Sequence, residues 1–213
     1  MKYIVILGDG MSDEPIEALG GKTPLEYANT PVMDELASKG EMGMTQNVPA
    51  GMHPGSEIAN LSVLGYNPLT DFTGRSPLEA LSVGVEMEPD DIIFRANLVT
   101  LTEAGPYGEK TITDHSSGEI STADADILMD AIRKEFNSKE IQFYTGTSYR
   151  HICVWKKGRA SHLEPPHDHL TQVIGPHLPA EAKLREMMER SFDVLNNHPL
   201  NLERAARGEN KAN

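Results

Sequence analysis

The first apolar run of the chain covers residues 3–7 and is followed at once by Gly-Asp-Gly at positions 8–10. A continuous β-rich apolar run that ends at glycine is typical of a buried parallel strand leading into a loop. The next apolar positions have helical spacing, because Val32 and Leu36 share one face of a segment that proline opens and glycine closes, which predicts a helix over 31–40. The opening therefore predicts a strand, a polar loop and a helix.

A second unit of the same kind is expected immediately afterwards. A short strand is predicted at 42–46, then a loop rich in proline and glycine at 48–55, then a helix over 56–64. Polar residues at the junction between a glycine-rich loop and a helix are a common way of building a functional site. We therefore expect chemistry at this junction.

From Asp71 onward the pattern changes to shorter, mixed elements. The expected elements are a short helix after Ser76-Pro77, a strand at 94–101, a polar loop at 114–118, a helix over 121–136, strands at 141–144 and 149–155, a proline- and histidine-rich linker at 163–169, and helices at 180–195 and 199–206. These elements predict an α+β block followed by a helical tail. The fold class expected for the whole chain is α/β.

Composition excludes several classes of function. The 213 residues carry 32 Asp+Glu against 19 Lys+Arg, a formal net charge of −13, and no basic cluster of the kind that binds nucleic acid. The N-terminal apolar run is too short for a signal peptide or a membrane span. Cys153 is the one cysteine, so no internal disulfide can form. We expect a cytoplasmic protein that binds neither nucleic acid nor membrane.

Asp9 and Ser56 are the first candidates for chemistry. Asp9 would lie beyond the carboxyl end of the first strand, where a carboxylate can bind a cation, although for Gly-Asp-Gly taken alone an Asx-turn that ends the strand is the favoured explanation. Ser56 would lie at a helix N-terminus, which favours a phosphoryl group, although an ordinary N-cap serine is the alternative. Asn60, one turn later, could donate to a phosphoryl oxygen or lie on an ordinary helix surface.

Several basic side chains are candidates for binding an anion. Arg75, Arg95 and Arg150 could each hold a carboxylate or phosphate in a bidentate manner, the alternative for each being a surface ion pair. His115 and His151 are weaker candidates for the same cleft. The His-Asp-His run at 167–169 resembles a metal cluster, but adjacent side chains in an extended loop point in different directions, so a polar linker is the expected interpretation.

The motifs, read together, resemble the archaeal-type cofactor-independent phosphoglycerate mutases, which belong to the alkaline-phosphatase-like metalloenzymes. The two most specific are ILGDGM at 6–11 and HPGSEIANLSVLGY at 53–66. The similarity extends over nearly the whole chain through TGRSPLEA at 73–80, FRANLVT at 94–100, SYRH at 148–151 and PPHD at 165–168. The resemblance implies interconversion of 3-phosphoglycerate and 2-phosphoglycerate, with no requirement for 2,3-bisphosphoglycerate.

The resemblance also implies a site. Ser56 would be the nucleophile that becomes transiently phosphorylated, and Asp9 and Ser56 would be ligands of two divalent metal ions, Mn²⁺, Mg²⁺ or Zn²⁺. The substrate-binding candidates are Arg75, Arg95, Arg150, His151 and Asn60. A metal-dependent phosphatase or another phosphoryl transferase could use the same Asp9 and Ser56, so these activities stay open as alternatives.

The length departs from that family, whose members are roughly twice as long. We therefore expect an N-terminal portion: residues 1–70 and 180–213 as parts of the metal-binding sheet domain, and 71–179 as an inserted α+β domain that binds substrate. The remaining metal ligands would lie in a C-terminal segment, so the isolated chain is expected to have little activity. A homo-oligomer or a C-terminal fragment is the expected partner, and a non-catalytic chain that binds a phosphorylated ligand or a protein is the further alternative.

Overall fold

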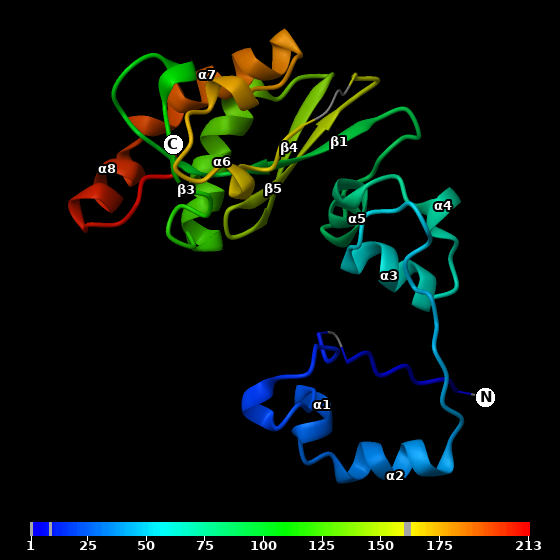
Figure 1. Cartoon of the computed structure of the whole chain (residues 1–213). Coiled ribbons are helices and arrows are strands. Elements are labelled where there is room, and N and C mark those ends of the chain that lie inside the picture. The colour runs from blue at the N-terminus through cyan, green and yellow to red at the C-terminus, as the bar shows by residue number, and fades with distance from the viewer. Residues whose placement is uncertain (1, 9, 160–162) are drawn as a thin grey trace. The chain divides into compact units, whose positions relative to one another are not determined.

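The computed structural model describes residues 2–8, 10–159 and 163–213. The chain forms two compact units, Met1–His53 and Pro54–Asn213 (Figure 1). The described part is mixed α/β with small sheets, as the sequence predicts. The assignment of 1–70 and 180–213 to one domain, with 71–179 inserted, stays a prediction.

The first unit consists of short helices joined by extended chain. Its elements are η1 (Glu17–Leu19), α1 (Pro24–Tyr27) and α2 (Pro31–Lys39). Thr23 and Glu26 form a reciprocal capping box at the start of α1, and Gly40 follows the last residue of α2, so the predicted helix over 31–40 is confirmed. These helices are determined by signals within a few residues of each other.

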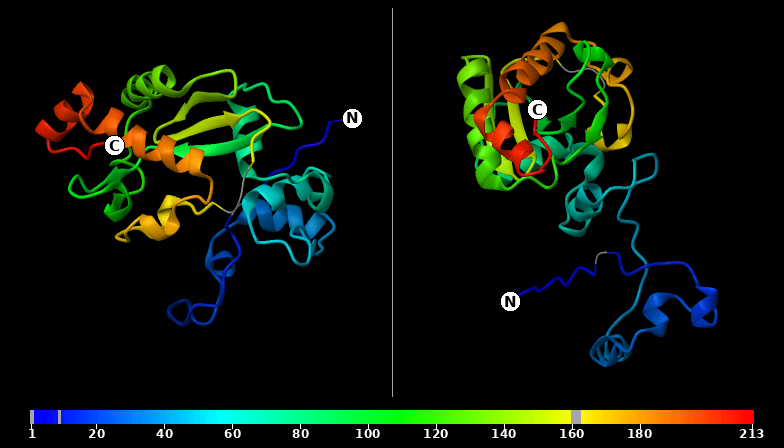
Figure 2. Two further views of the ribbon diagram at one scale, coloured as in Figure 1. Left: turned by 90° about the horizontal axis from the view of Figure 1, so that it is seen from above. Right: turned by 90° about the vertical axis from the view of Figure 1, so that its left-hand side faces the viewer.

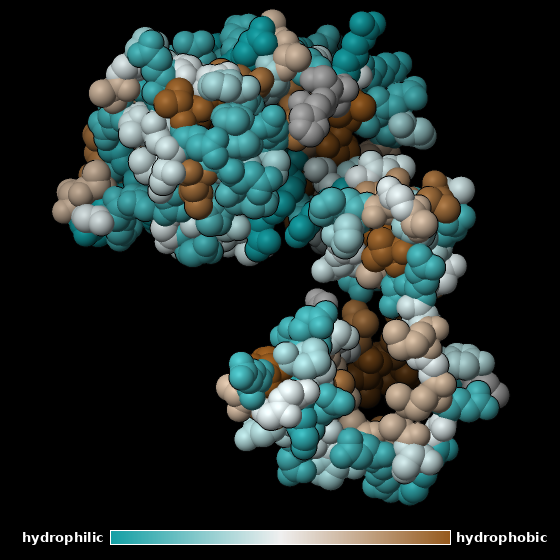
Figure 3. Space-filling model, viewed as in Figure 1, coloured by the Kyte–Doolittle hydropathy of each residue, from teal (hydrophilic) through white to brown (hydrophobic). Residues whose placement is uncertain are grey.

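The two strands predicted in this unit were wrong. Residues 3–7 and 42–46 are extended but form no strand among the described residues, and their apolar side chains are exposed: Ile6 is 88% exposed and Met44 99%. The physical reason is that a parallel strand exists only through hydrogen bonds to neighbouring strands, which local apolarity does not supply. Figure 3 shows the resulting apolar surface of this unit in brown.

The second unit contains the sheets and most of the helices. Its elements in chain order are α3 (Ser56–Val63), α4 (Pro68–Asp71), α5 (Arg75–Ser82), β1 (Ile92–Asn97), β2 (Thr100–Leu101), η2 (Tyr107–Glu109), β3 (Ile112–Asp114), α6 (Thr122–Phe136), β4 (Ile141–Thr147), β5 (Arg150–Trp155), η3 (Pro166–His169), η4 (Gly175–His177), α7 (Ala182–Asn196) and α8 (Pro199–Ala206). The predicted helices and the strands at 141–144 and 149–155 are confirmed. Within the described residues of both units, no helix is long and apolar enough to cross a membrane.

The main sheet is antiparallel, with strand order β1-β5-β4. Side chains alternate along β5: Ile152 and Val154 pack with Ala80 of α5, whereas Cys153 packs with Leu184 of α7. Helix α5 therefore covers one face of the sheet, while α6 and α7 cover the other (Figure 2). This arrangement brings α5, β1 and β5 together, and these three elements carry the arginine candidates.

The strand predicted at 94–101 is interrupted. Strand β1 ends at Asn97 and pairs with β5, whereas β2 begins at Thr100 and pairs with β3 in a separate two-stranded sheet. Between them the Leu98 N–H donates to the Tyr149 carbonyl at 2.9 Å. The interruption arises because the chain passes from one sheet to the other, which is a tertiary feature without a local sequence signal.

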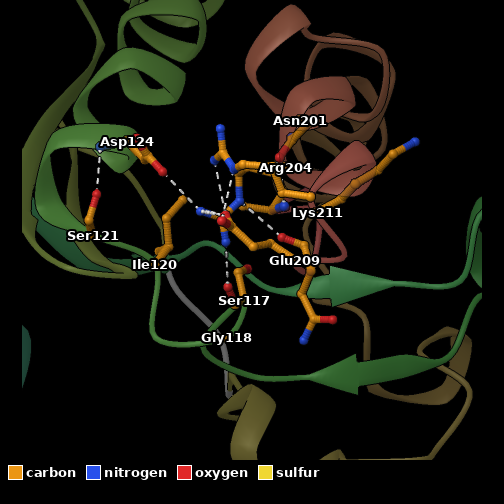
Figure 4. Close-up of polar contacts among 12 residues, drawn as sticks. Ser117, Gly118, Ile120, Ser121, Asp124, Asn201, Arg204, Glu209 and Lys211 are labelled. Atoms are coloured by element: carbon orange, nitrogen blue, oxygen red, sulfur yellow. Dashed lines mark hydrogen bonds and ion pairs between the residues drawn. The ribbon is translucent and has the colours of Figure 1, made fainter.

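Helix α8 is attached to the loop before α6 by a buried arginine. Arg204 is 4% exposed; its guanidinium donates to the Ser117 carbonyl at 2.9 Å, to the Asn210 carbonyl at 3.0 Å and to Asp124 Oδ2 at 3.0 Å. Figure 4 shows the Arg204 side chain between α8 and this loop. The hydrogen bonds satisfy the buried charge and join segments about 80 residues apart in the chain.

Candidate functional site

Ser56 is the first residue of α3, as predicted. Gly55 is the N-cap, and the first backbone bond into the helix is from the Ala59 N–H to the Gly55 carbonyl, so the N–H groups of the first turn have no helical acceptor. Ser56 is exposed, and its hydroxyl makes no hydrogen bond with any part of the chain that the structure describes. The hydroxyl is thus available at a helix N-terminus, which favours an anion.

Asp9 lies outside the described residues, so its predicted position near Ser56 stays a prediction. Asn60 lies on α3 one turn after Ser56 and is exposed. Residues four apart on a helix lie on the same face, so the Asn60 amide and the Ser56 hydroxyl face the same side. Their pairing at a phosphoryl group is untested.

The three candidate arginines lie on the elements that meet at one end of the main sheet, and two of them share a carboxylate. Arg75 Nε is 2.8 Å from Glu79 Oε1, and Arg95 Nε is 2.9 Å from Glu79 Oε2. Burial lowers the pKa of the Arg95 guanidinium; Glu79 opposes this effect, while the positive charges of Arg75 and Arg150 add to it. Arg75 and Arg95 are close together because they contact the same carboxylate.

A small cavity lies beside this cluster. It has a volume of about 160 Å³, and its lining includes Glu79, Arg150, His151 and Gly146. Arg150 makes no ion pair with any described acidic residue; its guanidinium carbon lies 5.4 Å from the centre of the Tyr149 ring. Arg150 and Glu79 are the charged side chains of this lining, and Arg75 and Arg95 lie next to it through their ion pairs with Glu79. Arg150 is therefore the lining group best able to bind an anion.

His151 also lines this cavity, but its ring points to the α6 side of the sheet, because side chains alternate along β5 and Ile152 faces α5. The residue is 1% exposed, and its Nδ1 accepts a bond of 3.2 Å from the Gly146 N–H, which places the ring proton on Nε2. Burial lowers the pKa of His151 to about 4; the charge of Arg133 acts in the same direction and Asp126 opposes it. Nε2 has no hydrogen-bond partner among the described residues. A buried donor without a partner is uncommon and favours a ligand at this position.

His115 lies in the strained loop that Arg204 holds. Ser117, Gly118 and Glu119 all have positive φ, of 52°, 70° and 53°, which is rare for the two residues that are not glycine. The His115 ring is edge-on to the Tyr149 ring, with centroids 5.8 Å apart. His115 and Arg150 therefore both contact Tyr149, which supports His115 as a member of the same region.

Glu79 was not predicted as part of this site. Glu79 joins Arg75 and Arg95, yet in the sequence it is an ordinary helix glutamate; its spacing of four from Arg75 was the available signal. The prediction of a linker over 163–169 was wrong for its second half, because Pro166–His169 form the short helix η3; His167 is exposed beside Asp168, whereas the His169 ring stacks on His177. No spacing rule connects those two histidines.

These features define an α/β protein with a serine at a helix N-terminus and a cluster of arginines beside a small cavity, a combination suited to phosphorylated ligands. The family described as 2,3-bisphosphoglycerate-independent phosphoglycerate mutase matches residues 37–201. The chain belongs to this family, in its archaeal-type branch.

Individual relatives carry the same family description. The chain is 50% identical to the probable 2,3-bisphosphoglycerate-independent phosphoglycerate mutase of Geobacter sulfurreducens, with 100% of this chain and 54% of that protein covered, and 44% identical to the Methanosarcina mazei mutase, with 100% and 53% covered. Among solved structures, the PH0037 protein from Pyrococcus horikoshii matches with a TM-score of 0.67 and 31% identity over 96% of this chain and 47% of that one. The cofactor-independent mutase from Thermoplasma acidophilum matches with a TM-score of 0.54 and 26% identity, over 95% and 55%. The chain spans about half the length of these relatives.

Proposed function

We propose that this chain supplies the nucleophile and the substrate-binding groups of a phosphoglycerate mutase that interconverts 3-phosphoglycerate and 2-phosphoglycerate. The observation that carries the proposal is the position of Ser56 at the first residue of α3, with a hydroxyl that no described residue binds beside first-turn N–H groups without a helical acceptor, in a chain of this family. A phosphoserine formed there would accept hydrogen bonds from the first turn of the helix.

The proposed reaction has two phosphoryl transfers. In the first, Ser56 Oγ forms a bond to phosphorus, the bond from phosphorus to O3 of the glycerate breaks, and the serine proton goes to O3. In the second, O2 of the reoriented glycerate attacks phosphorus, the bond to Oγ breaks, and the O2 proton returns to Oγ. Atoms and electrons balance, and the net result is an isomerisation.

The arginine cluster would hold the anionic groups of the substrate. Arg150 has no carboxylate partner among the described side chains and lines the cavity, and His151, the next residue of β5, would contribute as a neutral group. Arg75 and Arg95 already bind one carboxylate, that of Glu79, so the local geometry suits carboxylate recognition. Asn60 would donate its amide N–H to the phosphoryl group on Ser56.

The family resemblance assigns two divalent metal ions to this site. Of the ligands it names, the described residues supply one, the Ser56 hydroxyl, whereas such ions are usually held by several carboxylate or imidazole groups. The described donors are too few to fit the ions, so no step above is derived through them. Asp9 would contribute one further carboxylate.

The domain assignment follows the same resemblance. Residues 1–70 and 180–213 would belong to an alkaline-phosphatase-like sheet domain, and 71–179 would form an inserted domain. The exposed apolar run at 3–7 supports a strand in a larger sheet. Ile6 is 88% exposed, and a continuous exposed apolar run is typical of a surface that another protein segment covers. A cytoplasmic location and self-association stay predictions.

The test uses a chimera in which residues 1–213 are joined to the C-terminal half of the Geobacter sulfurreducens relative. Phosphorus-31 NMR with 3-phosphoglycerate and Mn²⁺ distinguishes 2-phosphoglycerate from inorganic phosphate. We expect isomerisation by the chimera, little turnover by the 213-residue chain alone, and a loss of about a thousandfold or more in the chimera with Ser56→Ala.

The matched control is Ser62→Ala, on the same helix, which should leave the rate nearly unchanged. Phosphate release without isomerisation would favour a phosphatase instead. Retention of activity by the Ser56→Ala chimera would remove Ser56 from the role of nucleophile.

A further inference from the structure

Two histidines and a glutamate form a cluster after β5 that the proposed mutase function does not use. His169 Nε2 and His177 Nδ1 each lie 2.7 Å from the same oxygen, Oε2 of Glu164, and the three ligand atoms all lie within 4.8 Å of one another. We propose that Glu164, His169 and His177 bind a divalent transition metal ion of the zinc type.

The chain holds these side chains on a firmly attached segment. Between the two histidines, the Thr171 N–H donates to the Ile112 carbonyl at 2.8 Å, and the Ile174 N–H donates to the Lys110 carbonyl at 2.9 Å. These bonds attach residues 171–174 to Ile112, the first residue of β3, and to Lys110, two residues before it. The two histidines therefore reach the cluster from the ends of an anchored segment, which lowers the entropic cost of assembling a site.

The second histidine is positioned by a close backbone contact. A Cβ atom on Gly175 would lie 2.6 Å from the Gly108 carbonyl oxygen, so η4, which ends at His177, packs directly against η2. The two imidazole rings are stacked, with centroids 3.7 Å apart and an angle of 22° between the planes. The side chains of His169 and His177 are 15% and 25% exposed, which leaves the cluster partly shielded but open to an ion.

The donor set favours transition metals over hard cations. Two imidazole nitrogens and one carboxylate oxygen suit Zn²⁺, Co²⁺ or Ni²⁺, whereas Mg²⁺ and Ca²⁺ prefer oxygen ligands alone. Bonds of about 2.0–2.2 Å in a tetrahedral site separate ligand atoms by roughly 3.3 Å, so binding requires the carboxylate to move outward and the stacked imidazole rings to rotate. Glu164 has a side chain 33% exposed, which permits this movement.

The positions of the ring protons on His169 and His177 are also compatible with metal binding. Without metal, Glu164 accepts from Nε2–H of His169 and Nδ1–H of His177. Metal binding moves each ring proton to the other nitrogen of the same ring. Nδ1 of His169 has no hydrogen-bond partner within the described chain, so no existing bond opposes the change of tautomer there. Metal ligation uses the neutral form of each imidazole.

The experiment titrates the metal-free 213-residue chain with Zn²⁺ by calorimetry and with Co²⁺ by visible absorption, at neutral pH. We expect Zn²⁺ binding at this cluster, Co²⁺ d–d bands that indicate nitrogen ligands, and no comparable binding of Mg²⁺. His169→Gln and His177→Gln should each weaken binding at least tenfold. Each variant is checked for folding by circular dichroism and by Trp155 fluorescence.

A control variant makes the result specific. His167→Gln alters an adjacent, 53% exposed histidine outside the cluster and should bind Zn²⁺ as the parent chain does. Absence of Zn²⁺ binding, or equal affinity in His177→Gln and the parent, would overturn the proposal and leave the cluster as a hydrogen-bonded contact. Because neither readout involves mutase activity, this result is independent of the proposed function.

Discussion

Replacing Arg204 by alanine is expected to destabilise the second unit substantially. The side chain is 5% exposed and donates to two backbone carbonyls and to Asp124, all at 2.9–3.0 Å. The substitution removes these donors together and leaves acceptors in a largely dry site without partners. Losing one member of such a network costs more than losing an exposed ion pair, because the remaining groups keep their desolvation penalty.

The expected magnitude follows from the burial of the partners. Removing one partner of a buried ion pair costs about 3–5 kcal/mol. The Asp124 side chain is 27% exposed and is therefore partly hydrated once the arginine is absent, which places the loss near 3 kcal/mol. For a unit of this size, that loss corresponds to a decrease in Tm of about 6–12 °C.

The assay is urea unfolding followed by Trp155 fluorescence, because the one tryptophan of the chain lies in β5 and reports on this unit. Arg207→Ala is the matched control, since Arg207 is 50% exposed and pairs with Glu209; it should change the free energy of unfolding by no more than about 0.5 kcal/mol. A loss below about 1 kcal/mol for Arg204→Ala, or one equal to the control, would refute the reasoning.

Two further predictions concern buried titratable groups. The pKa of His151 is about 4 when folded, while an unfolded histidine titrates near 6.5, so the unfolded chain alone binds this proton as pH falls from 6.5 to 4. The folded state should lose about 3 kcal/mol across that window, and urea unfolding of His151→Gln should show a shallower pH dependence; identical slopes would contradict the assignment. Burial raises the pKa of the Cys153 thiol to about 12, so a disulfide reagent should modify it only after unfolding, and fast modification of the native chain would show an accessible thiolate.

Helix boundaries were predictable because their determinants are local. The Ser121 hydroxyl accepts from the Asp124 N–H at 3.1 Å, as the spacing of these residues indicates, and α6 begins at the next residue after Ser121. Pro54-Gly55 likewise predicted the start of α3 at Ser56. Each signal acts within one helical turn, so a single sequence contains all the information needed to predict where these helices begin.

The strands and the polar clusters depend on partners distant in the chain. The run at 3–7 has the composition of a strand, yet no described segment pairs with it, whereas β1 is a strand because β5 lies beside it. In the same way, the pairing of Arg95 with Glu79 and the stacking of His169 on His177 follow from the packing of α5 on β1 and of η4 on η2. Residue type predicted which side chains carry chemistry, but not which of them meet.

The strand order β1-β5-β4 has a consequence for the order of folding. Strands β4 and β5 are joined by a turn at Ser148-Tyr149 and form a local hairpin, a structure that closes in about 1–10 μs in isolation. Strand β1 joins the same sheet only after a loop of roughly 50 residues closes, at an entropic cost of about 3.5 kcal/mol. Arg150 and His151 are on the hairpin and Arg95 is on β1, so the arginine cluster beside the small cavity should be completed late in folding, when the long loop closes.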